Sequence, residues 1–174
     1  MAAEAVATFL GPKVKGYVLF EQRKNGTVVD AFFNKLPDGK HGFHIHKGGD
    51  LRGEGCKLAC DHWHKGRPTS HGGPPSEEGH RHTGDLGNIE IPSSAETFKE
   101  EYFLRDVKVE ELYGRSVIVH ADPDDLGKGP HEDSKTTGHS GARIACAIIG
   151  RVLPACQPPS PTSKKNTRKN KRGQ

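Results

Sequence analysis

The stretch VKGYVLFEQRKNGTVVDAFFNKL, residues 14–36, decides the fold. It contains two runs rich in β-branched and aromatic residues, Val14–Gln22 and Thr27–Leu36, with Asn25-Gly26 between them. Asn-Gly between two such runs is the strongest short-range signal for a β-hairpin, because both residues tolerate the positive φ of a tight turn. The stretch therefore predicts two neighbouring antiparallel strands.

Similar signals continue on both sides of this hairpin. Ala5–Leu10 ends at Gly11-Pro12, and Asp38-Gly39 follows the second run of the hairpin. About eight short strands separated by turn residues indicate an antiparallel β-sandwich or barrel. Beyond the hairpin and Ala5–Leu10, we expect strands at His41–His46, Thr97–Val109, Ser116–His120 and Arg143–Val152.

The composition of the chain agrees with a turn-rich β-protein. Its 174 residues suit one domain plus a tail, and only 32% of them are hydrophobic. The 22 glycines and 12 prolines exclude a helical bundle. No apolar run approaches the roughly 20 residues that a transmembrane helix needs, so the sequence also excludes a helical membrane protein.

The positive charge is concentrated at the C-terminus. Residues 157–174 hold six of the 26 lysines and arginines and no acidic residue, so the remainder is mildly acidic, with 20 basic against 22 acidic side chains. We therefore expect a globular domain over residues 1–156 and a disordered basic tail over residues 157–174. The tail can attract nucleic acid or an anionic surface only weakly, because it has no aromatic residues for stacking.

The N-terminal sequence, Met1-Ala-Ala-Glu-Ala-Val, lacks the basic start and apolar run of a secretory signal, so we expect a cytoplasmic protein. The default expectation for its cysteines in that compartment is free thiols. The four cysteines are Cys56, Cys60, Cys146 and Cys156.

Histidines gather in and beside two long irregular segments, Lys47–Leu86 and Ala121–Ala142. His44 and His46 lie two residues apart on an expected strand and so point to the same face, which the strand end at His120 can approach. Four imidazoles suit copper, and three imidazoles with a carboxylate suit zinc. Further candidate donors are His62, His71, His80, His82 and Asp85, and the residue types alone do not divide them between two sites.

Four segments resemble the signature motifs of the copper/zinc superoxide dismutase family, in the family's order. The resemblance covers roughly residues 5–152 and implies an all-β, eight-stranded antiparallel Greek-key barrel with two long functional loops. It also implies disproportionation of superoxide to oxygen and hydrogen peroxide, with copper cycling between Cu(II) and Cu(I). The four segments are Gly42-Phe43-His44-Ile45-His46, Gly84-Asp85-Leu86-Gly87-Asn88, Val119-His120 with Pro123-Asp124-Asp125-Leu126-Gly127, and Gly141-Ala142-Arg143-Ile144-Ala145-Cys146.

The resemblance implies that His62 is shared between copper and zinc. The span from His71 to Asp85 is two residues longer than in the family, so counting forward favours His80 and counting back from Asp85 favours His82. We prefer His82, because the turn His82-Thr83-Gly84-Asp85 fixes the ligand geometry locally. The implied copper ligands are His44, His46, His62 and His120, and the implied zinc ligands are His62, His71, His82 and Asp85.

The resemblance also implies roles for residues around the metals. Asp124 would link the copper ligand His44 to the zinc ligand His71, and Arg143 would guide superoxide to copper. Thr137 would narrow the channel, and the charges of Glu132-Asp133 and Lys135 would shape the field around it. A disulfide between Cys56 and Cys146 would reverse the default expectation of free thiols.

The resemblance further implies a homodimer that pairs around Gly114 and Ile149-Gly150, although Arg151 lies where the family has small or apolar residues. A copper-delivering chaperone is another expected partner. The alternative function is a non-catalytic relative, either a zinc-stabilised decoy or a copper-handling domain. Such a relative would be expected to lack a copper ligand or Arg143, and this sequence has both.

Overall fold

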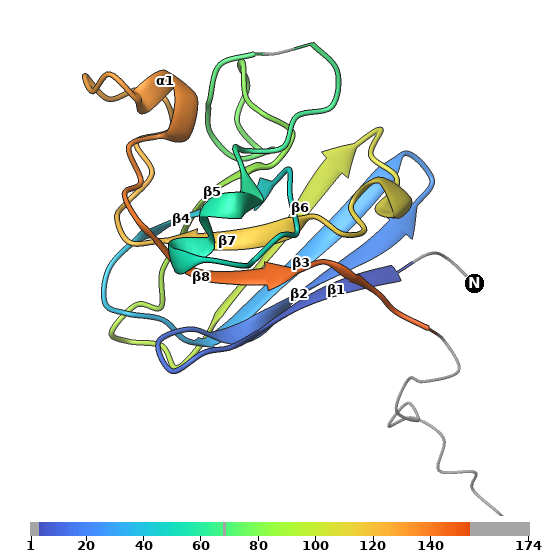
Figure 1. The fold of residues 1–174 in the computed structure, drawn as a ribbon, viewed down its shortest axis with the longest axis horizontal. Coiled ribbons are helices and arrows are strands. Elements are labelled where there is room, and N and C mark those ends of the chain that lie inside the picture. Colours follow the sequence, from blue (N-terminus) through green and yellow to red (C-terminus); the bar gives the residue numbers. More distant parts are fainter. Residues whose placement is uncertain (1–3, 68, 154–174) are drawn as a thin grey trace, which may run out of the picture.

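The computed structural model describes residues 4–67 and 69–153 and has the two-layer β architecture that the sequence predicts (Figure 1). A five-stranded sheet has the order β6-β3-β2-β1-β9, and a four-stranded sheet has the order β5-β4-β7-β8. All of their neighbouring strands are antiparallel. The strands are β1 (Glu4–Leu10), β2 (Lys15–Arg23), β3 (Gly26–Lys35), β4 (His41–His46), β5 (Asp85–Ile89), β6 (Phe98–Arg105), β7 (Ser116–His120), β8 (Arg143–Ile148) and β9 (Gly150–Arg151).

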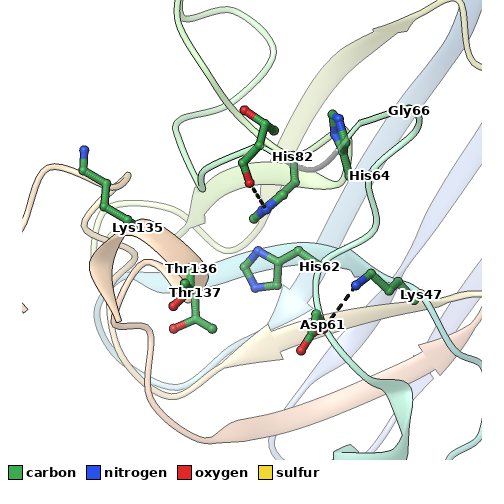
Figure 2. Close-up of a pocket in the computed structure, with 10 residues that line it drawn as sticks. Lys47, Asp61, His62, His64, Gly66, His82, Lys135, Thr136 and Thr137 are labelled. Atoms are coloured by element: carbon green, nitrogen blue, oxygen red, sulfur yellow. Dashed lines mark hydrogen bonds and ion pairs between the residues drawn. The ribbon is translucent and has the colours of Figure 1, made fainter. Parts of the chain in front are cut away.

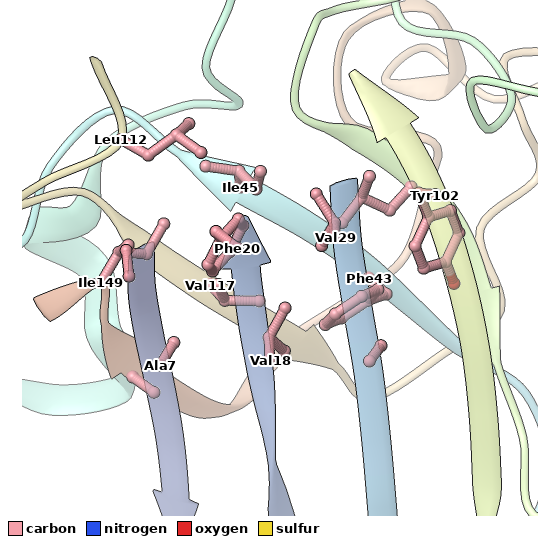
Figure 3. Packing of buried hydrophobic residues seen from close by; sticks show 14 of the residues in the cluster. Ala7, Val18, Phe20, Val29, Phe43, Ile45, Tyr102, Leu112, Val117 and Ile149 are labelled. Carbon is pink, nitrogen blue, oxygen red and sulfur yellow. The ribbon is translucent and has the colours of Figure 1, made fainter. Parts of the chain in front are cut away.

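The Asn25-Gly26 hairpin is present as predicted. Strands β2 and β3 pair from Lys15↔Lys35 to Arg23↔Gly26, with one register shift next to Gly16. Side chains alternate between the core and the outside along β3, as the pleat of a strand requires. The apolar core lies between the two sheets (Figure 3). Within it, Phe33 of one sheet packs edge-to-face on Phe43 of the other, with 5.7 Å between ring centres.

Three boundaries differ from the sequence-based expectation. Strand β5 was not predicted: its first two residues, Asp85 and Leu86, fall in the segment expected to be irregular, and no strand was expected over residues 87–89. Strand β6 ends at Arg105, since Asp106 adopts a positive φ of 57°. The last predicted strand is split at the buried Ile149: β8 pairs with β7 in one sheet, and β9 pairs with β1 in the other.

The two long segments carry two of the short helices and lie over the outer face of the four-stranded sheet (Figure 1). The first holds η1 (Glu54–Ala59) and the second holds α1 (Ser134–Thr137), while η2 (Val109–Glu111) precedes β7. A disulfide joins Cys56 of η1 to Cys146 of β8, as the family resemblance implies, and Cys60 is free and exposed.

The expected tail, residues 157–174, the domain end at 156, and Cys156 lie outside the described residues. Within the part of the chain that the structure describes, no helix is long and apolar enough to cross a bilayer.

Candidate metal centre

Strands β4 and β7 present three histidines to the loop-covered face of the four-stranded sheet. Along β4, Phe43 and Ile45 enter the core, so His44 and His46 point to the opposite face, as the period of two predicts. Neighbouring β7 ends at His120, whose Nε2 lies 3.4 Å from His46 Nε2. All three imidazoles are buried although they lie outside the apolar core.

The first long segment brings His62 to these histidines. His62 forms an isolated β-bridge with His46, and Trp63 N–H donates to Ile45 O at 2.7 Å, so the segment runs beside β4 at this point. The rings of His62 and His44 stack with their centres 4.0 Å apart. His44, His46, His62 and His120 each direct one nitrogen into a space where these atoms lie within 4.8 Å of one another.

A second donor set shares His62. Its members are His62, His71, His82 and Asp85, again with one ligand atom each inside a 4.8 Å group. Asp85 lies at the start of β5, beside His44 in register, so the four-stranded sheet positions a member of each set. Figure 2 shows His62 and His82 facing a common space below the loop.

His82, and not His80, belongs to this second set. The His82 backbone N–H donates to Asp85 Oδ2 at 2.7 Å, and His82 Nδ1 lies 3.4 Å from Asp85 Oδ1, so the local turn holds the two side chains together. His80 is exposed. The two additional residues of the segment are therefore accommodated before the turn, as the preference for His82 assumes.

Unpartnered nitrogen atoms show that both sets fit metal ions. Buried polar atoms almost always have hydrogen-bond partners. Within the described residues, the only buried side-chain nitrogen or oxygen atoms without one are His44 Nδ1, His62 Nε2, His71 Nδ1 and His82 Nδ1. All four belong to members of the two donor sets, so imidazole nitrogens without hydrogen-bond partners face the two places where metal ions would bind.

The opposite nitrogens of the same rings are fixed by outer partners. Asp124 accepts hydrogen bonds from His44 Nε2 at 2.7 Å and His71 Nε2 at 2.8 Å, and thus links a member of each set. His46 Nδ1 donates to Cys60 O at 2.8 Å, and His82 Nε2 donates to Thr69 O at 3.0 Å. Such partners fix the tautomer and the orientation of a ligating imidazole.

Burial keeps the first set uncharged. Desolvation, followed by the charges of neighbouring histidines, lowers the pKa of His44 well below its usual value. Burial also lowers the pKa of His46 and takes that of His120 to about 3, and in both cases the positive charge of Arg143 adds to the effect. These imidazoles are therefore neutral at physiological pH, as a metal ligand must be.

The second set contains a carboxylate and is polarised differently. Although burial opposes the change, a hydrogen bond to Asp124 and the Asp85 carboxylate, 3.1 Å from His71 Nδ1, raise the pKa of His71 to about 9. Burial would raise the pKa of Asp85, but the hydrogen bond from His62 and the close contacts with His71 and His82 hold it far below its usual range. Without metal, His71 and Asp85 therefore form a charged pair. Zinc would take the place of one proton, the one that His71 carries.

Arg143 lies at the start of β8, with its guanidinium fixed on the first long segment. Nη1 donates to Cys56 O at 2.8 Å, and Nη2 donates to Cys60 O at 2.6 Å. The Cys56–Cys146 disulfide joins the same two elements. Because Cys60 O also accepts from His46 Nδ1, one carbonyl connects Arg143 to the first donor set.

A cavity of about 420 Å³ opens over His62. Thr136, Thr137 and Lys135 of α1 line one side of it, as the family resemblance implies for Thr137 and Lys135. The described residues that line this cavity do not include Arg143. Its opposite wall consists of Lys47 and Asp61 beside His62, a pair that no sequence motif indicates.

The remaining histidines have structural contacts. His41 Nδ1 donates to His120 O at 2.9 Å, and its Nε2 lies 3.2 Å from Pro37 O, so this imidazole is bonded to the backbone. His131 and His139 stack at 3.6 Å at the ends of the α1 segment, and His139 pairs with Asp133. His64 contacts Thr83 through Nδ1.

Comparisons with known proteins agree with the site. Residues 14–149 match the family model described as copper/zinc superoxide dismutase (SODC). The chain is 41% identical over 152 residues to "Superoxide dismutase [Cu-Zn]" of Paramecium bursaria Chlorella virus 1, covering 84% of this chain and 77% of that relative.

A second relative and a solved structure are also similar. "Extracellular superoxide dismutase [Cu-Zn]" of Haemonchus contortus is 41% identical over 144 residues, which are 80% of this chain and 76% of that relative. The crystal structure of "the clock protein EA4" superposes with a TM-score of 0.76 at 33% identity, covering 86% of this chain and 94% of the other.

Proposed function

Because this chain belongs to the copper/zinc superoxide dismutase family, we propose that Arg143, Thr137 and Asp124 prepare its metal centre for the reaction of that family. The reaction is the disproportionation of superoxide, in which one superoxide gives an electron to another and two protons complete hydrogen peroxide beside the oxygen released. The chain retains every residue of the copper and zinc sites.

The sharing of His62 is the observation that carries this function. The copper set is His44, His46, His62 and His120, and the zinc set is His62, His71, His82 and Asp85. Bound by the first set, copper supplies a one-electron redox couple, and zinc in the second set has no redox chemistry. A zinc-stabilised decoy needs only the zinc set, so an imidazole placed between two cations favours the catalytic function over the decoy.

His62 is also suited to handle a proton. Its Nδ1 is directed at Asp85, 2.8 Å away in the zinc set, and its Nε2 faces the copper set without a partner. Burial lowers the pKa of His62, so this nitrogen does not retain a proton at neutral pH. We assign Nε2 as the atom that holds a proton transiently and delivers it to the forming peroxide.

Arg143 supports binding of the superoxide anion. Its guanidinium is permanently charged, and the carbonyl groups of Cys56 and Cys60 hold it near His46 and His120. Thr137 lines the cavity over His62 across from Lys47 and Asp61 and limits its width. A small anion is therefore favoured over a large one.

The test of this function is reconstitution of the metal-free chain with copper and zinc, followed by elemental analysis and direct measurement of superoxide decay. We expect one copper and one zinc per chain and catalytic decay. A chain that takes up zinc alone and leaves superoxide untouched would be the non-catalytic relative.

We further propose that the protein is of the intracellular type and acts in the cytoplasm. The exposed free thiol of Cys60 supports this, because free surface thiols persist best in a reducing compartment, whereas the Cys56–Cys146 disulfide counts against it. One relative is named extracellular, so the compartment needs a direct test. Fractionation of the native cells should place the activity in the cytosol, and recovery from the medium would contradict the proposal.

We also propose a homodimer. Gly114 N–H donates to Ile149 O, so the two expected contact segments are adjacent, and the space around Gly114 is open. The disulfide-linked elements η1 and β8 expose Leu58 and Ile148. Arg151 is exposed at the sheet edge, so it is not an unpaired charge in the core. Analytical ultracentrifugation should give twice the chain mass, and a monomer at micromolar concentration would contradict the proposal.

Two further partners are proposed from the sequence and the family. A copper chaperone is expected to load the buried copper set, and the basic tail is a candidate contact for anionic surfaces. Deletion of residues 157–174 should leave dismutation intact and remove any such retention.

A further inference from the structure

The cavity over His62 has a wall that the family motifs do not explain. Lys47 follows the copper ligand His46, and Asp61 precedes the shared His62. Both side chains line the cavity, across from Lys135 on α1 (Figure 2). Lys47 Nζ contacts Asp61 Oδ2 at 3.1 Å.

The backbone fixes the position of this pair. Lys47 N–H donates to Asp61 O at 3.0 Å, and Lys47 O accepts from Arg115 Nη1 at 3.0 Å. Both ends of the Lys47 peptide are thus held, and the two side chains start from neighbouring segments that flank His62. The pair is exposed, at 51% for Lys47 and 80% for Asp61, so it contributes little to the stability of the fold.

Asp61 is unfavourable for the reaction of this site. Its carboxylate lies beside His62, which an incoming anion must approach. It is also near enough to Arg143 for its negative charge to interact with the positive charge of the guanidinium. A negative charge at the mouth of a cavity lowers the local concentration of anions and slows their entry. An anion-consuming enzyme with an uncompensated carboxylate there would be slower than one without it.

We propose that Lys47 is a positioning residue for superoxide, whose charge neutralises Asp61 at the mouth of the cavity. With Lys47 present, an anion entering the cavity meets the charge of Lys135 on its wall, and that of Arg143 near His46 and His120 outside this wall, without opposition from Asp61. The inference rests on the proposed function, since it assumes that an anion enters above His62. It adds a residue to the anion path that neither the metal ligands nor Arg143 accounts for.

The test is a charge cycle on the copper- and zinc-loaded protein, with Lys47→Gln, Asp61→Asn and the double variant. At low ionic strength we expect Lys47→Gln to lower kcat/KM about two- to fourfold and Asp61→Asn to raise it by a similar factor. The double variant should return close to the wild type. All differences should shrink at high salt, because the pair is exposed.

Azide provides a readout other than activity. Its dissociation constant at the Cu(II) protein, followed by absorbance, should rise in Lys47→Gln and fall in Asp61→Asn by similar factors. Lys99→Gln removes a lysine from β6 in the other sheet and is the matched control, with no expected change. Elemental analysis confirms equal metal content.

The outcomes separate this inference from the proposed function. If the wild type is active but Lys47→Gln matches it in both kcat/KM and azide affinity, the inference is wrong and the function stands. A double variant as slow as Lys47→Gln would also overturn it, because Lys47 would then act other than by cancelling Asp61. A wild type that binds neither copper nor azide would overturn both.

Discussion

At the scale of single residues, the site depends on groups that do not touch a metal. Asp124 is buried and accepts one hydrogen bond from each metal set, so it holds His44 and His71 with their Nδ1 atoms toward the metal positions. Its own geometry is fixed by Asn88, whose side chain accepts from Asp124 N–H at 2.7 Å. One carboxylate therefore orients two ligands of different ions.

Asp124→Asn should weaken zinc binding by about 10- to 100-fold. The two carboxylate oxygens of Asp124 accept one hydrogen bond from each imidazole, whereas the asparagine amide has only one acceptor oxygen. Competition with a chromophoric chelator measures this affinity. Asp38→Asn, in an exposed turn, is the control and should leave it unchanged. An unchanged affinity in Asp124→Asn would show that His71 is oriented by its loop alone.

His82→Ala should lose zinc, whereas His80→Ala should retain it, because only His82 has a nitrogen in the set with His71 and Asp85. The measurement is zinc content after dialysis at limiting free zinc. Retention by the His82 variant together with loss by the His80 variant would reverse the assignment.

At the scale of elements, the strand period of two explains how much of the site the sequence could reveal. It placed His44 and His46 on one face without knowledge of the tertiary fold, and the turn before Asp85 identified His82. The contacts of Cys60 O with His46 and Arg143 had no sequence signal, because a carbonyl acts regardless of residue type. Strand β5 was missed since its Gly87 and Asn88 favour turns in isolation, and only pairing with β4 makes them a strand.

The second long segment depends on a glycine for its approach to the metals. Gly138 ends α1 with a φ of 68°, and a Cβ there would lie 2.0 Å from Asp124 Oδ1 and 2.4 Å from His71 Nε2. The segment thus packs its backbone directly on the Asp124–His71 hydrogen bond, and only glycine permits that distance.

Gly138→Ala should displace this segment and reduce zinc affinity by about tenfold or more, whereas Gly39→Ala should not. Gly39 also has a positive φ, 94°, but a Cβ added there would meet no atom within 4 Å, so it controls for backbone strain alone. Zinc titration of both variants makes the comparison. Equal affinities would mean that the segment yields without disturbing Asp124.

At the scale of the whole molecule, the stability of the metal-free protein has proton-linked contributions of both signs, of which His120 and His71 are examples. Burial takes the pKa of His120 to about 3, so its stability contribution is lost as the pH falls from about 6.5, where the unfolded chain takes up the proton. The pKa shift of His71 has the opposite sign, so its contribution to stability depends on pH in the opposite way. Its pKa of about 9 stabilises the folded state fully below about 6.5, and this contribution is lost as the pH rises through about 9.

The free energy of unfolding of the metal-free protein should therefore be highest near pH 6.5 and fall on both sides. The alkaline fall is of the order of 3 kcal/mol, from the shift of His71. Urea denaturation between pH 5 and 10 measures it, and a His71→Asn variant should lose the alkaline branch. Stability that increases from pH 6.5 to 9 would contradict the assignment of the charged pair.

The central claim is that His62 joins two different metal ions. Anomalous diffraction from crystals of the reconstituted protein, recorded at the copper and zinc absorption edges, tests it most directly. We predict a copper peak among His44, His46, His62 and His120 and a separate zinc peak among His62, His71, His82 and Asp85, one at each ring nitrogen of His62. A single peak, or a His62 ring in contact with only one ion, would contradict the account.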